Sequence, residues 1–369
     1  MIQNIDLMIV GGGPAGLMAA LAAAEAAPED ARILLCERDE ALGGQLVKQT
    51  HKFFGSEKQH AGERGFFIGR DLAEAVRDEK KIQVLTDATV LGLYEDGVVT
   101  VLHDDKHLKY RPQKLIVATG ASEKFLAFPG NDLPGIYGAG AVQTLMNVSG
   151  VKPAERVVMV GAGNIGLIVS YQLLQAGVDV ACVVEAAPQI GGYLVHASKL
   201  ARSGVPIRTG WTVKEAFGEE TLEGVVLVQL DESFQQIPGT EETVACDALC
   251  LAVGLSPLAD LLYQADCAMT YVRELSGAVP VVDENLMTSV EGIYVCGDVS
   301  GIEEASAAMV EGRLAGCAAA KALGWNAEAA QAEIENAQVE LSELRSGPTG
   351  ARIRAGLAKM KGKRGAGAC

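Results

Sequence analysis

The amino-acid sequence predicts an α/β protein of two units, each a parallel sheet flanked by helices. Three observations support this fold class. A Gly-x-Gly-x-x-Gly turn between an apolar strand pattern and a helical pattern occurs twice, beginning at Gly11 and at Gly161. Further strand patterns follow the second unit near the end of the chain. The 369 residues suit two domains, and 49% apolar residues suffice for two packed cores.

The two copies of the turn share one order of features. Each has an apolar strand, the glycine turn, a nearly uncharged helix and a second strand followed by an acid, with a glycine pair six residues later. The first copy comprises residues 2–10, Gly11, Gly13, Gly16, residues 17–27, Ile33–Cys36, Glu37 and Gly43-Gly44. The second comprises residues 158–160, Gly161, Gly163, Gly166, residues 167–176, residues 178–184, Glu185 and Gly191-Gly192.

This order is the one that a Rossmann-like dinucleotide-binding domain of the three-layer ββα/βαβ type requires. The glycines permit the turn, let the backbone approach a pyrophosphate and let helix and strand pack closely. The helix N-terminus offers N–H groups to the phosphates, and the acid accepts hydrogen bonds from a ribose. The alternative is a plain strand-to-helix turn whose glycines serve packing alone.

Charge and cysteine usage exclude several other classes of protein. With 31 Lys+Arg against 47 Asp+Glu the net charge is −16, which disfavours nucleic-acid binding. The eight cysteines form no C-x-x-C pair, so we expect neither a zinc nor another metal site, and buried thiols in a reducing compartment. Residues 157–178 are uncharged and long enough for a membrane span, but their glycines indicate a strand, a turn and a helix. We expect a cytoplasmic protein without a membrane span.

The remaining patterns complete the two units. We expect strands over residues 90–94, 99–102, 115–118, 224–230, 249–253, 281–283 and 293–296, and helices over residues 304–323 and Ala327–Leu344, the last capped by Asn326. The tail from Arg345 to Cys369 holds seven basic residues and no acid. Three alternatives stay open for it: folding back on its own domain, docking an acidic partner, or a solvated end.

Together these motifs resemble the flavoprotein pyridine-nucleotide oxidoreductases with two dinucleotide-binding domains, over about residues 5–325. The likeness rests on the first glycine turn with Glu37, on Ala118-Thr119-Gly120 before the inserted unit, and on Gly297-Asp298 near the end. It implies FAD in the first unit and NAD in the second. It also implies an FAD-binding domain over residues 1–122 and 281–325, an NAD-binding domain over 123–280, and a C-terminal helix and basic tail over 326–369.

The resemblance assigns cofactor-binding roles residue by residue. For FAD these are Gly11, Gly13, Pro14, Ala15, Gly16, Glu37, Arg38, Gly44, Gln45, Ala118, Thr119, Gly120, Gly297 and Asp298. For NAD they are Gly161, Gly163, Asn164, Ile165, Gly166 and Glu185. A carboxylate at position 185 favours NAD over NADP, because it would repel a 2′-phosphate. Lys199 and Arg202 lie further along and could soften that preference.

Gly43-Gly44-Gln45-Leu46 with Phe54-Gly55 is similar to thioredoxin reductase, but Gly138-Ala139-Gly140-Ala141 stands where that enzyme carries C-x-x-C. Disulfide reduction by that dithiol is therefore excluded. The likeness implies that residues 45–54 pass near the flavin ring, and it makes Lys48 and His51 the candidates for catalytic residues that stabilise reduced flavin. The alternative is that both are solvated loop residues, as loop lysines usually are.

Residues 125–143 look like the alpha-type subunits of heteromeric amine and amino-acid dehydrogenases, a group that includes sarcosine oxidase alpha, opine and dye-linked proline dehydrogenases and hydrogen cyanide synthase. The resemblance implies a second flavoprotein that holds the amine or amino-acid substrate as partner. The basic tail adds, as an acidic partner that it could dock, a ferredoxin-like subunit, alone or beside the second flavoprotein. We therefore expect an enzyme that transfers electrons between NAD(H) and FAD as one subunit of such a complex. A stand-alone NADH:acceptor reductase and a non-catalytic nucleotide-binding scaffold are the alternatives.

Overall fold

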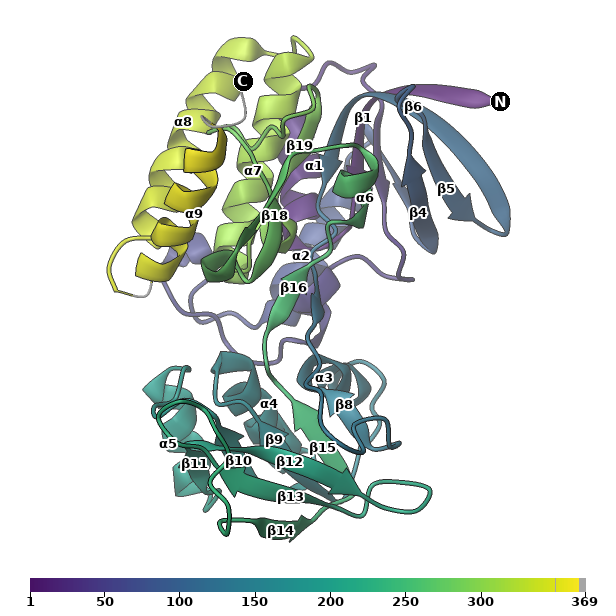
Figure 1. Cartoon of the computed structure of the whole chain (residues 1–369). Coiled ribbons are helices and arrows are strands. Elements are labelled where there is room, and N and C mark those ends of the chain that lie inside the picture. Colours follow the sequence, from purple (N-terminus) through teal and green to yellow (C-terminus); the bar gives the residue numbers. More distant parts are fainter. Residues whose placement is uncertain (349, 365–369) are drawn as a thin grey trace. The chain divides into compact units, whose positions relative to one another are not determined.

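The computed structural model describes residues 1–348 and 350–364 and divides into two compact units. Unit 1 comprises Met1–Ser122 and Ser256–Cys369, and unit 2 comprises Glu123–Leu255. The two segments that connect the units form short strands, β7 (Ala121–Glu123) and β16 (Leu255–Pro257), which pair with each other. Unit 2 is thus an insertion, as the sequence predicts (Figure 1).

Unit 1 is built on a seven-stranded sheet. Its strands are β1 (Ile2–Val10), β2 (Ile33–Cys36), β3 (Ile82–Leu85), β4 (Ala88–Leu93), β5 (Val99–His103), β6 (Lys106–Val117) and β19 (Ile293–Val295). The order is β3-β2-β1-β6-β5-β4, and β19 pairs in parallel with the end of β6. The long strand β6 joins the parallel strands of the sheet to its antiparallel strands. Residues 106–110 pair antiparallel with β5, and residues 109–117 pair parallel with β1.

Three helices of unit 1 are packed one on the next beside this sheet, α1 against α7 and α7 against α8 (Figure 1). The helical elements of unit 1 are α1 (Pro14–Ala26), η1 (Gly44–Lys48), η2 (Glu57–Gln59), α2 (Gly65–Asp78), α6 (Asp260–Gln264), η3 (Arg273–Leu275), η4 (Gly297–Ser300), α7 (Ala305–Ala322), α8 (Ala327–Leu344) and α9 (Ala351–Arg364). A Cβ atom at Gly312 would lie 2.0 Å from the Ala15 carbonyl oxygen, and one at Gly316 would lie 2.3 Å from that of Ala19. Helices α1 and α7 therefore approach backbone to backbone.

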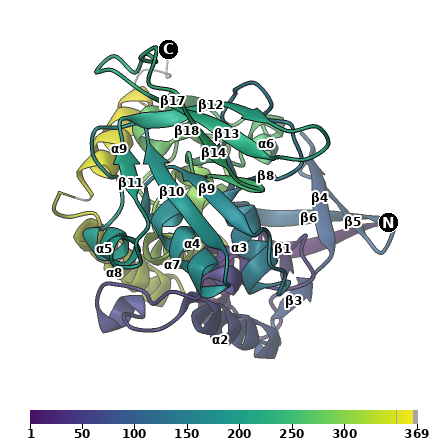
Figure 2. The ribbon, with the colours of Figure 1, turned by 90° about the horizontal axis from the view of Figure 1, so that it is seen from below.

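Unit 2 has three layers. A parallel sheet of order β11-β10-β9-β15-β8 lies between helices and the antiparallel sheet β12-β13-β14 (Figure 2). Its strands are β8 (Ile136–Gly138), β9 (Arg156–Val160), β10 (Asp179–Glu185), β11 (Ile207–Thr209), β12 (Trp211–Phe217), β13 (Gly224–Gln229), β14 (Glu242–Ala245) and β15 (Ala248–Leu251), and its helices are α3 (Ala139–Asn147), α4 (Asn164–Gln175) and α5 (Leu194–Arg202). Alternate side chains of β9 serve the two cores, Met159 facing the helices and Val158 the antiparallel sheet.

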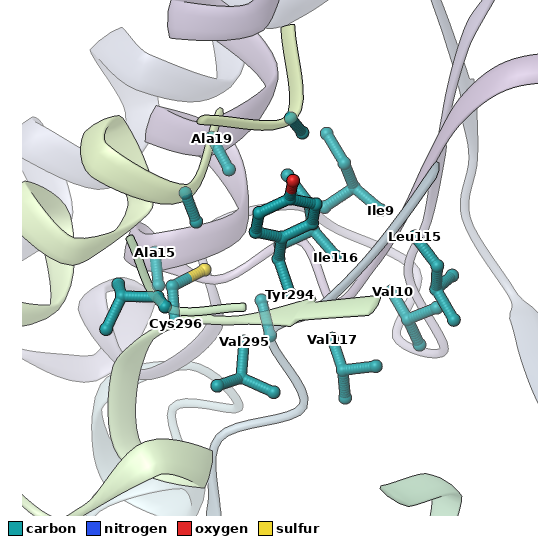
Figure 3. Close-up of a cluster of buried hydrophobic side chains, with 14 of the residues drawn as sticks. Ile9, Val10, Ala15, Ala19, Leu115, Ile116, Val117, Tyr294, Val295 and Cys296 are labelled. Atoms are coloured by element: carbon teal, nitrogen blue, oxygen red, sulfur yellow. The ribbon is translucent and has the colours of Figure 1, made fainter. Parts of the chain in front are cut away.

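The core of unit 1 continues beneath the glycine turn. Figure 3 shows Cys296 beside Ala15, with Tyr294 and Ile116 close by. Cys296 is fully buried, and burial raises the pKa of its thiol well above the ordinary value. This cysteine packs the end of β19 against the start of α1.

The structure differs from the sequence analysis at the point where the chain returns to unit 1. The sequence predicts that return at Val281, and the structure has it at Ser256. The intervening segment contains the hairpin β17 (Met269–Val272) and β18 (Gly277–Pro280) and packs Leu262 and Leu275 into the core of unit 1. Residues 281–283, predicted to be a strand, have no regular structure, because β18 ends at Pro280.

The C-terminal tail folds back on its own unit as far as the structure describes it. Helix α9 contacts η3 and β17, and it buries Ile353 and Met360 in the core of unit 1. Helix α8 begins and ends as predicted, but Asn326 at its N-cap makes no side-chain capping hydrogen bond. Cys369 lies outside the described residues.

Residues 157–178 form β9, a turn and α4, up to the residue before β10, as predicted. Among the residues that the structure describes, no helix combines the length and apolarity that a membrane crossing needs.

Candidate functional site

The first glycine turn lies between β1 and α1 and leaves no room for a side chain at Gly11, Gly12 or Gly16. Gly11 has a φ of +108°, and a Cβ atom there would lie 2.3 Å from the Ala118 carbonyl oxygen at the end of β6. A Cβ atom at Gly16 would lie 1.8 Å from the Gly11 carbonyl oxygen. Pro14 opens the helix and Gly13 stands at its N-cap without a side-chain cap or an acid in the first turn. The amide end of α1 therefore carries no side chain that would compete with an anionic ligand.

Glu37 fastens this turn to the end of β2. Its carboxylate accepts hydrogen bonds from the Gly12 N–H at 2.7 Å and the Asp39 N–H at 2.9 Å, and the residue is 7% exposed. The Gly12 carbonyl in turn accepts from the Gly43 N–H at 2.8 Å. The acid, the turn and the glycine pair thus form one hydrogen-bonded group.

The second turn repeats this arrangement, with one more hydrogen bond from its glycine pair. Glu185 accepts from the Ala162 N–H at 2.8 Å and the Ala187 N–H at 2.9 Å. The Ala162 carbonyl accepts from the N–H groups of the glycine pair, Gly191 and Gly192. Helix α4 likewise begins after Gly163 without a side-chain cap, and a Cβ atom at Gly163 would meet nothing within 4 Å. The internal repeat is therefore a repeat of the site and not of the fold alone.

One of the residues assigned to the second turn, Asn164, has a further role that sequence analysis did not detect. The Asn164 side chain accepts a hydrogen bond from the Tyr193 N–H at 2.8 Å, so it ties the segment after the glycine pair to the start of α4. Ile165 is 43% exposed beside it. Gly166 permits the same close turn as Gly16, because its Cβ atom would lie 2.0 Å from the Gly161 carbonyl oxygen.

Gly297-Asp298 joins the first turn in unit 1. These residues open the short helix η4, and a Cβ atom at Gly297 would lie 2.8 Å from the Ala15 Cβ atom. Burial, together with the nearby Glu311 and Glu303 carboxylates, raises the pKa of Asp298 to about 7, against a weaker opposing hydrogen bond from the Glu303 N–H. The structure thus brings together two motifs that lie about 280 residues apart in the sequence.

The turn after β6 is the third part of the site in unit 1. Ala118 is buried beneath Gly11 and Gly16. The Thr119 hydroxyl donates to the Leu258 carbonyl at 2.7 Å, and Gly120 has a φ of +73°. Thr119 therefore fixes the outgoing chain to the returning chain within unit 1.

The segment after the first glycine pair contains the remaining predicted residues. Gly44 opens η1 with a φ of +51°, and its Cβ atom would lie 2.7 Å from the Gly13 Cα atom. Gln45 is exposed. Lys48 and His51 are half-buried and each has interacting partners, so neither is a freely solvated loop residue. Arg38 is exposed and contacts Asp39 at 3.7 Å.

The cysteines provide no reactive thiol in the described part of the chain. Seven are free and buried, and burial raises the pKa of each thiol. Residues 138–141 stand at the N-terminus of α3, where the Glu123 carboxylate accepts from the Gly140 N–H at 2.6 Å and the Ala141 N–H at 3.1 Å. A carboxylate thus caps the helix end at which the resemblance to thioredoxin reductase would place a dithiol.

These features fit a dinucleotide in each unit. Each turn presents an amide-rich helix end without a side-chain cap, backbone that a Cβ atom would obstruct, and a strand-end carboxylate at the edge of the turn. In unit 1 the Gly297-Asp298 loop adds a second group of backbone and carboxylate beside the same helix end.

Comparison with known proteins gives the family. The profile of the family described as pyridine nucleotide-disulphide oxidoreductase matches residues 5–312, most of the chain and both turns. The chain belongs to this family. Its enzymes are FAD- and NAD(P)-dependent oxidoreductases, which confirms the predicted enzyme class and cofactors at the level of the family.

Curated relatives include several that belong to multi-subunit enzymes. An opine oxidase subunit of Agrobacterium tumefaciens is 30% identical over 332 residues, which are 85% of this chain and 65% of that protein. The alpha chain of sarcosine oxidase from Rhizobium meliloti is 29% identical over 70% of this chain and 25% of its own length. A hydrogen cyanide synthase subunit of Pseudomonas protegens is 28% identical over 85% of this chain and 70% of its own length. The chain therefore spans less than two thirds of the length of the opine and sarcosine oxidase relatives.

Solved structures confirm the fold class. L-proline dehydrogenase from P. horikoshii superimposes with a TM-score of 0.69 at 24% identity, over 91% of this chain and 60% of that one. Thioredoxin reductase from T. acidophilum superimposes with a TM-score of 0.71 at 20% identity, over 87% of this chain and 99% of that one. The fold of two Rossmann-like units, one inserted in the other, is thus the predicted one.

The raised pKa of Asp298 predicts a pH-dependent cost to stability. The folded chain binds this proton more tightly than the unfolded chain, so stability falls as the pH rises from about 4 to about 7. We expect Asp298→Asn, which is uncharged throughout, to raise the free energy of unfolding of the ligand-free chain by up to about 4 kcal/mol at pH 8 and by only about 1 kcal/mol at pH 4.5. Urea titrations at both pH values measure this. Asp30→Asn, in an exposed turn, is the control; an equal change at both pH values for Asp298→Asn would contradict the expectation.

Proposed function

We propose that this chain transfers electrons between NAD(H), bound by unit 2, and FAD, bound by unit 1, as one subunit of an amine or amino-acid dehydrogenase complex. One observation carries the assignment of the two nucleotides. Both units have the same clamp between a carboxylate and a glycine turn, but unit 1 adds the Gly297-Asp298 loop against the first turn of α1. A flavin nucleotide, which has a ribityl chain in addition to its pyrophosphate, needs that second set of contacts.

The residues of each unit would bind and orient their nucleotide. The amide end of α1 would hold the FAD pyrophosphate, Glu37 the ribose of its adenosine and Asp298 the ribityl hydroxyls. The amide end of α4 and Glu185 would serve NAD(H) in the same way. When bound, the two cofactors supply hydride transfer between nicotinamide and flavin, and the protein supplies orientation and electrostatics.

The carboxylate of Glu185 supports NAD rather than NADP as the substrate of unit 2. It is fixed by two backbone N–H groups, so it cannot swing away from an added 2′-phosphate without breaking both bonds. The sequence analysis named Lys199 as a cation that could soften the preference for NAD over NADP. Its ammonium instead lies over the Tyr171 ring, 5.5 Å from the ring centroid.

Membership in a complex is proposed from the relatives. Those named above are subunits of opine oxidase, sarcosine oxidase and hydrogen cyanide synthase. By analogy the partner would be a second flavoprotein that holds an amine or amino-acid substrate, a ferredoxin-like subunit, or both. The seven buried free thiols favour a reducing compartment, the cytoplasm, as the location.

The first test is an anaerobic absorbance spectrum of the purified chain before and after NADH. We expect a yellow protein whose flavin band bleaches, because hydride from NADH reduces FAD. A yellow protein that does not bleach would contradict the direct NADH route and point to a flavin reduced by a partner. A colourless protein that releases ATP or NAD on denaturation would overturn the assignment of unit 1.

The matched acids allow the two nucleotide assignments to be tested separately. We expect Glu37→Ala to lower the ratio of FAD to protein after gel filtration, and Glu185→Ala to leave that ratio unchanged. Glu185→Ala should instead raise the NADH concentration for half-bleaching roughly tenfold or more, the range for losing a hydrogen bond to a charged group. Each variant is the other's control, because both remove the same carboxylate from the same clamp. Loss of FAD in Glu185→Ala would reverse the assignment.

The proposed role of Lys48 is electrostatic. A cation beside the flavin ring stabilises its anionic reduced form, so we expect Lys48→Met to lower the midpoint potential by roughly 30 mV or more, about 1.4 kcal/mol for a two-electron couple. Dye-linked titration of the flavin measures this, with Lys52→Met at an exposed neighbouring position as control. The same design applies to His51. An unchanged potential in Lys48→Met would remove this lysine from the site.

A further inference from the structure

The C-terminal segment reaches the Gly297-Asp298 loop through one side chain. Arg345 follows the last residue of α8, and its side chain is 13% exposed. Its Nη2 atom donates to Glu303 at 2.6 Å and also to Glu311, and its Nε atom lies 3.1 Å from both Glu303 oxygens. One guanidinium therefore joins two acids that flank the start of α7.

Glu311 connects Arg345 to the loop itself. One carboxylate oxygen accepts from Arg345, and the other accepts from the Gly297 N–H at 2.8 Å and the Ser300 hydroxyl at 3.0 Å. Both Glu311 and Ser300 are buried. The backbone of Gly297, which must stay against Ala15, is thus held by an acid that is itself held by Arg345.

The charges around the loop make this guanidinium necessary. Three carboxylates, those of Asp298, Glu303 and Glu311, lie close enough to perturb one another, and mutual repulsion adds to burial in raising the pKa of the first two. Arg345 opposes this effect on Glu303, with a smaller contribution from Arg352. Removal of one partner from a buried ion pair leaves an uncompensated charge, which is far costlier than the loss of a surface pair.

Arg313 also bridges two acids between α7 and α8, but its contacts with the described residues do not reach the Gly297-Asp298 loop. Arg313 of α7 lies 3.0 Å from Glu333 of α8 and also contacts Glu340 of α8. Glu340 in turn accepts from the Gln59 side chain at 2.8 Å, and no hydrogen bond joins this group to the Gly297 loop among the described residues. Arg313 therefore joins α7 to α8 without reaching the loop, whereas Arg345 joins α8 to the loop.

We propose that Arg345 is a positioning residue of the nucleotide site in unit 1: it fixes Glu311 beneath Gly297 and neutralises the acids beside Asp298. This proposal rests on the proposed function in taking FAD as the ligand. Arg345 lies beyond residue 312, where the family profile ends. The segment after α7 is accordingly part of the site and not only an added covering layer.

The test compares three variants of the full chain with the wild type. Arg345→Met removes the guanidinium, and Arg313→Met is the matched loss of an arginine that bridges two acids. The double variant Arg345→Met/Glu311→Gln keeps an oxygen that can accept from Gly297 but no longer needs a cation. The readouts are hydrogen exchange of residues 293–301 in the ligand-free chain and the dissociation constant of added FAD from flavin fluorescence.

We expect Arg345→Met to speed exchange of residues 293–301 and to weaken FAD binding by roughly tenfold or more, and Arg313→Met to change either by less than about threefold. The double variant should recover most of the FAD affinity, which a mere packing defect would not allow. Equal losses in the two single variants, or wild-type values in Arg345→Met, would overturn the proposal.

The test also covers a variant that does not fold and a wild-type chain that binds no FAD. If Arg345→Met does not fold, Arg345→Lys, whose single ammonium lacks the guanidinium fork, should show an intermediate loss in both readouts, and wild-type values would overturn the proposal. If the wild-type chain binds no FAD, the proposed function fails, while the exchange of residues 293–301 still decides whether Arg345 positions the loop.

Discussion

A carboxylate that accepts hydrogen bonds from the backbone of a glycine turn is the constraint on which both units depend. Glu37 and Glu185 each come at the end of a second strand and each hold the turn that precedes a helix. Charge-assisted bonds of this kind are stronger than neutral ones, and burial strengthens them further. The turn can therefore carry three glycines, the least constrained of residues, and still keep one conformation.

Close packing of small residues gives unit 1 its second motif. Because Gly312 and Gly316 bring α7 against α1, the loop before α7 can reach the first turn of α1, and Gly297 meets Ala15 there. The same approach buries Glu311 next to the loop, which creates a charge that needs a counterion. Arg345 supplies this counterion from the end of α8. The close packing of α1 and α7 therefore requires the ion pair between Arg345 and Glu311.

Much of this could be predicted from the sequence, because the glycine turns, the acids and the helices are specified locally. The bounds of Ala327–Leu344 and the positions of Glu37 and Glu185 at the ends of their strands are of this kind. The hydrogen bonds of the two carboxylates to the glycine turns were not predicted, because the sequence analysis assigned both acids to a ribose. What could not be predicted depends on tertiary contacts. The return at Ser256 is decided by where Leu262 and Leu275 pack, and the role of Arg345 by ion pairs across 34 and 42 residues.

One smaller error has the same origin. The segment Val281-Val282-Asp283 predicts a strand, but the hairpin β17-β18 uses the residues before it. The sequence left three alternatives open for the basic tail. Its basic residues are interspersed with glycines and apolar residues and form no clear amphipathic pattern, so the burial of Ile353 and Met360 is not evident from the sequence. In the structure Lys359 pairs with Glu274, which gives part of the tail's positive charge a partner within the same unit.

The cap on α3 has a consequence for thiol chemistry at this turn. A helix N-terminus makes a thiol acidic, and a disulfide reductase depends on that effect. In this chain Glu123 occupies the same amides, and a side chain at position 138 would lie 2.1 Å from its carboxylate. Cysteines restored at this turn would meet a negative charge in place of a bare dipole, and their thiolates would be disfavoured. Thiol chemistry at this turn would therefore need the removal of the Glu123 carboxylate as well as the introduction of two cysteines.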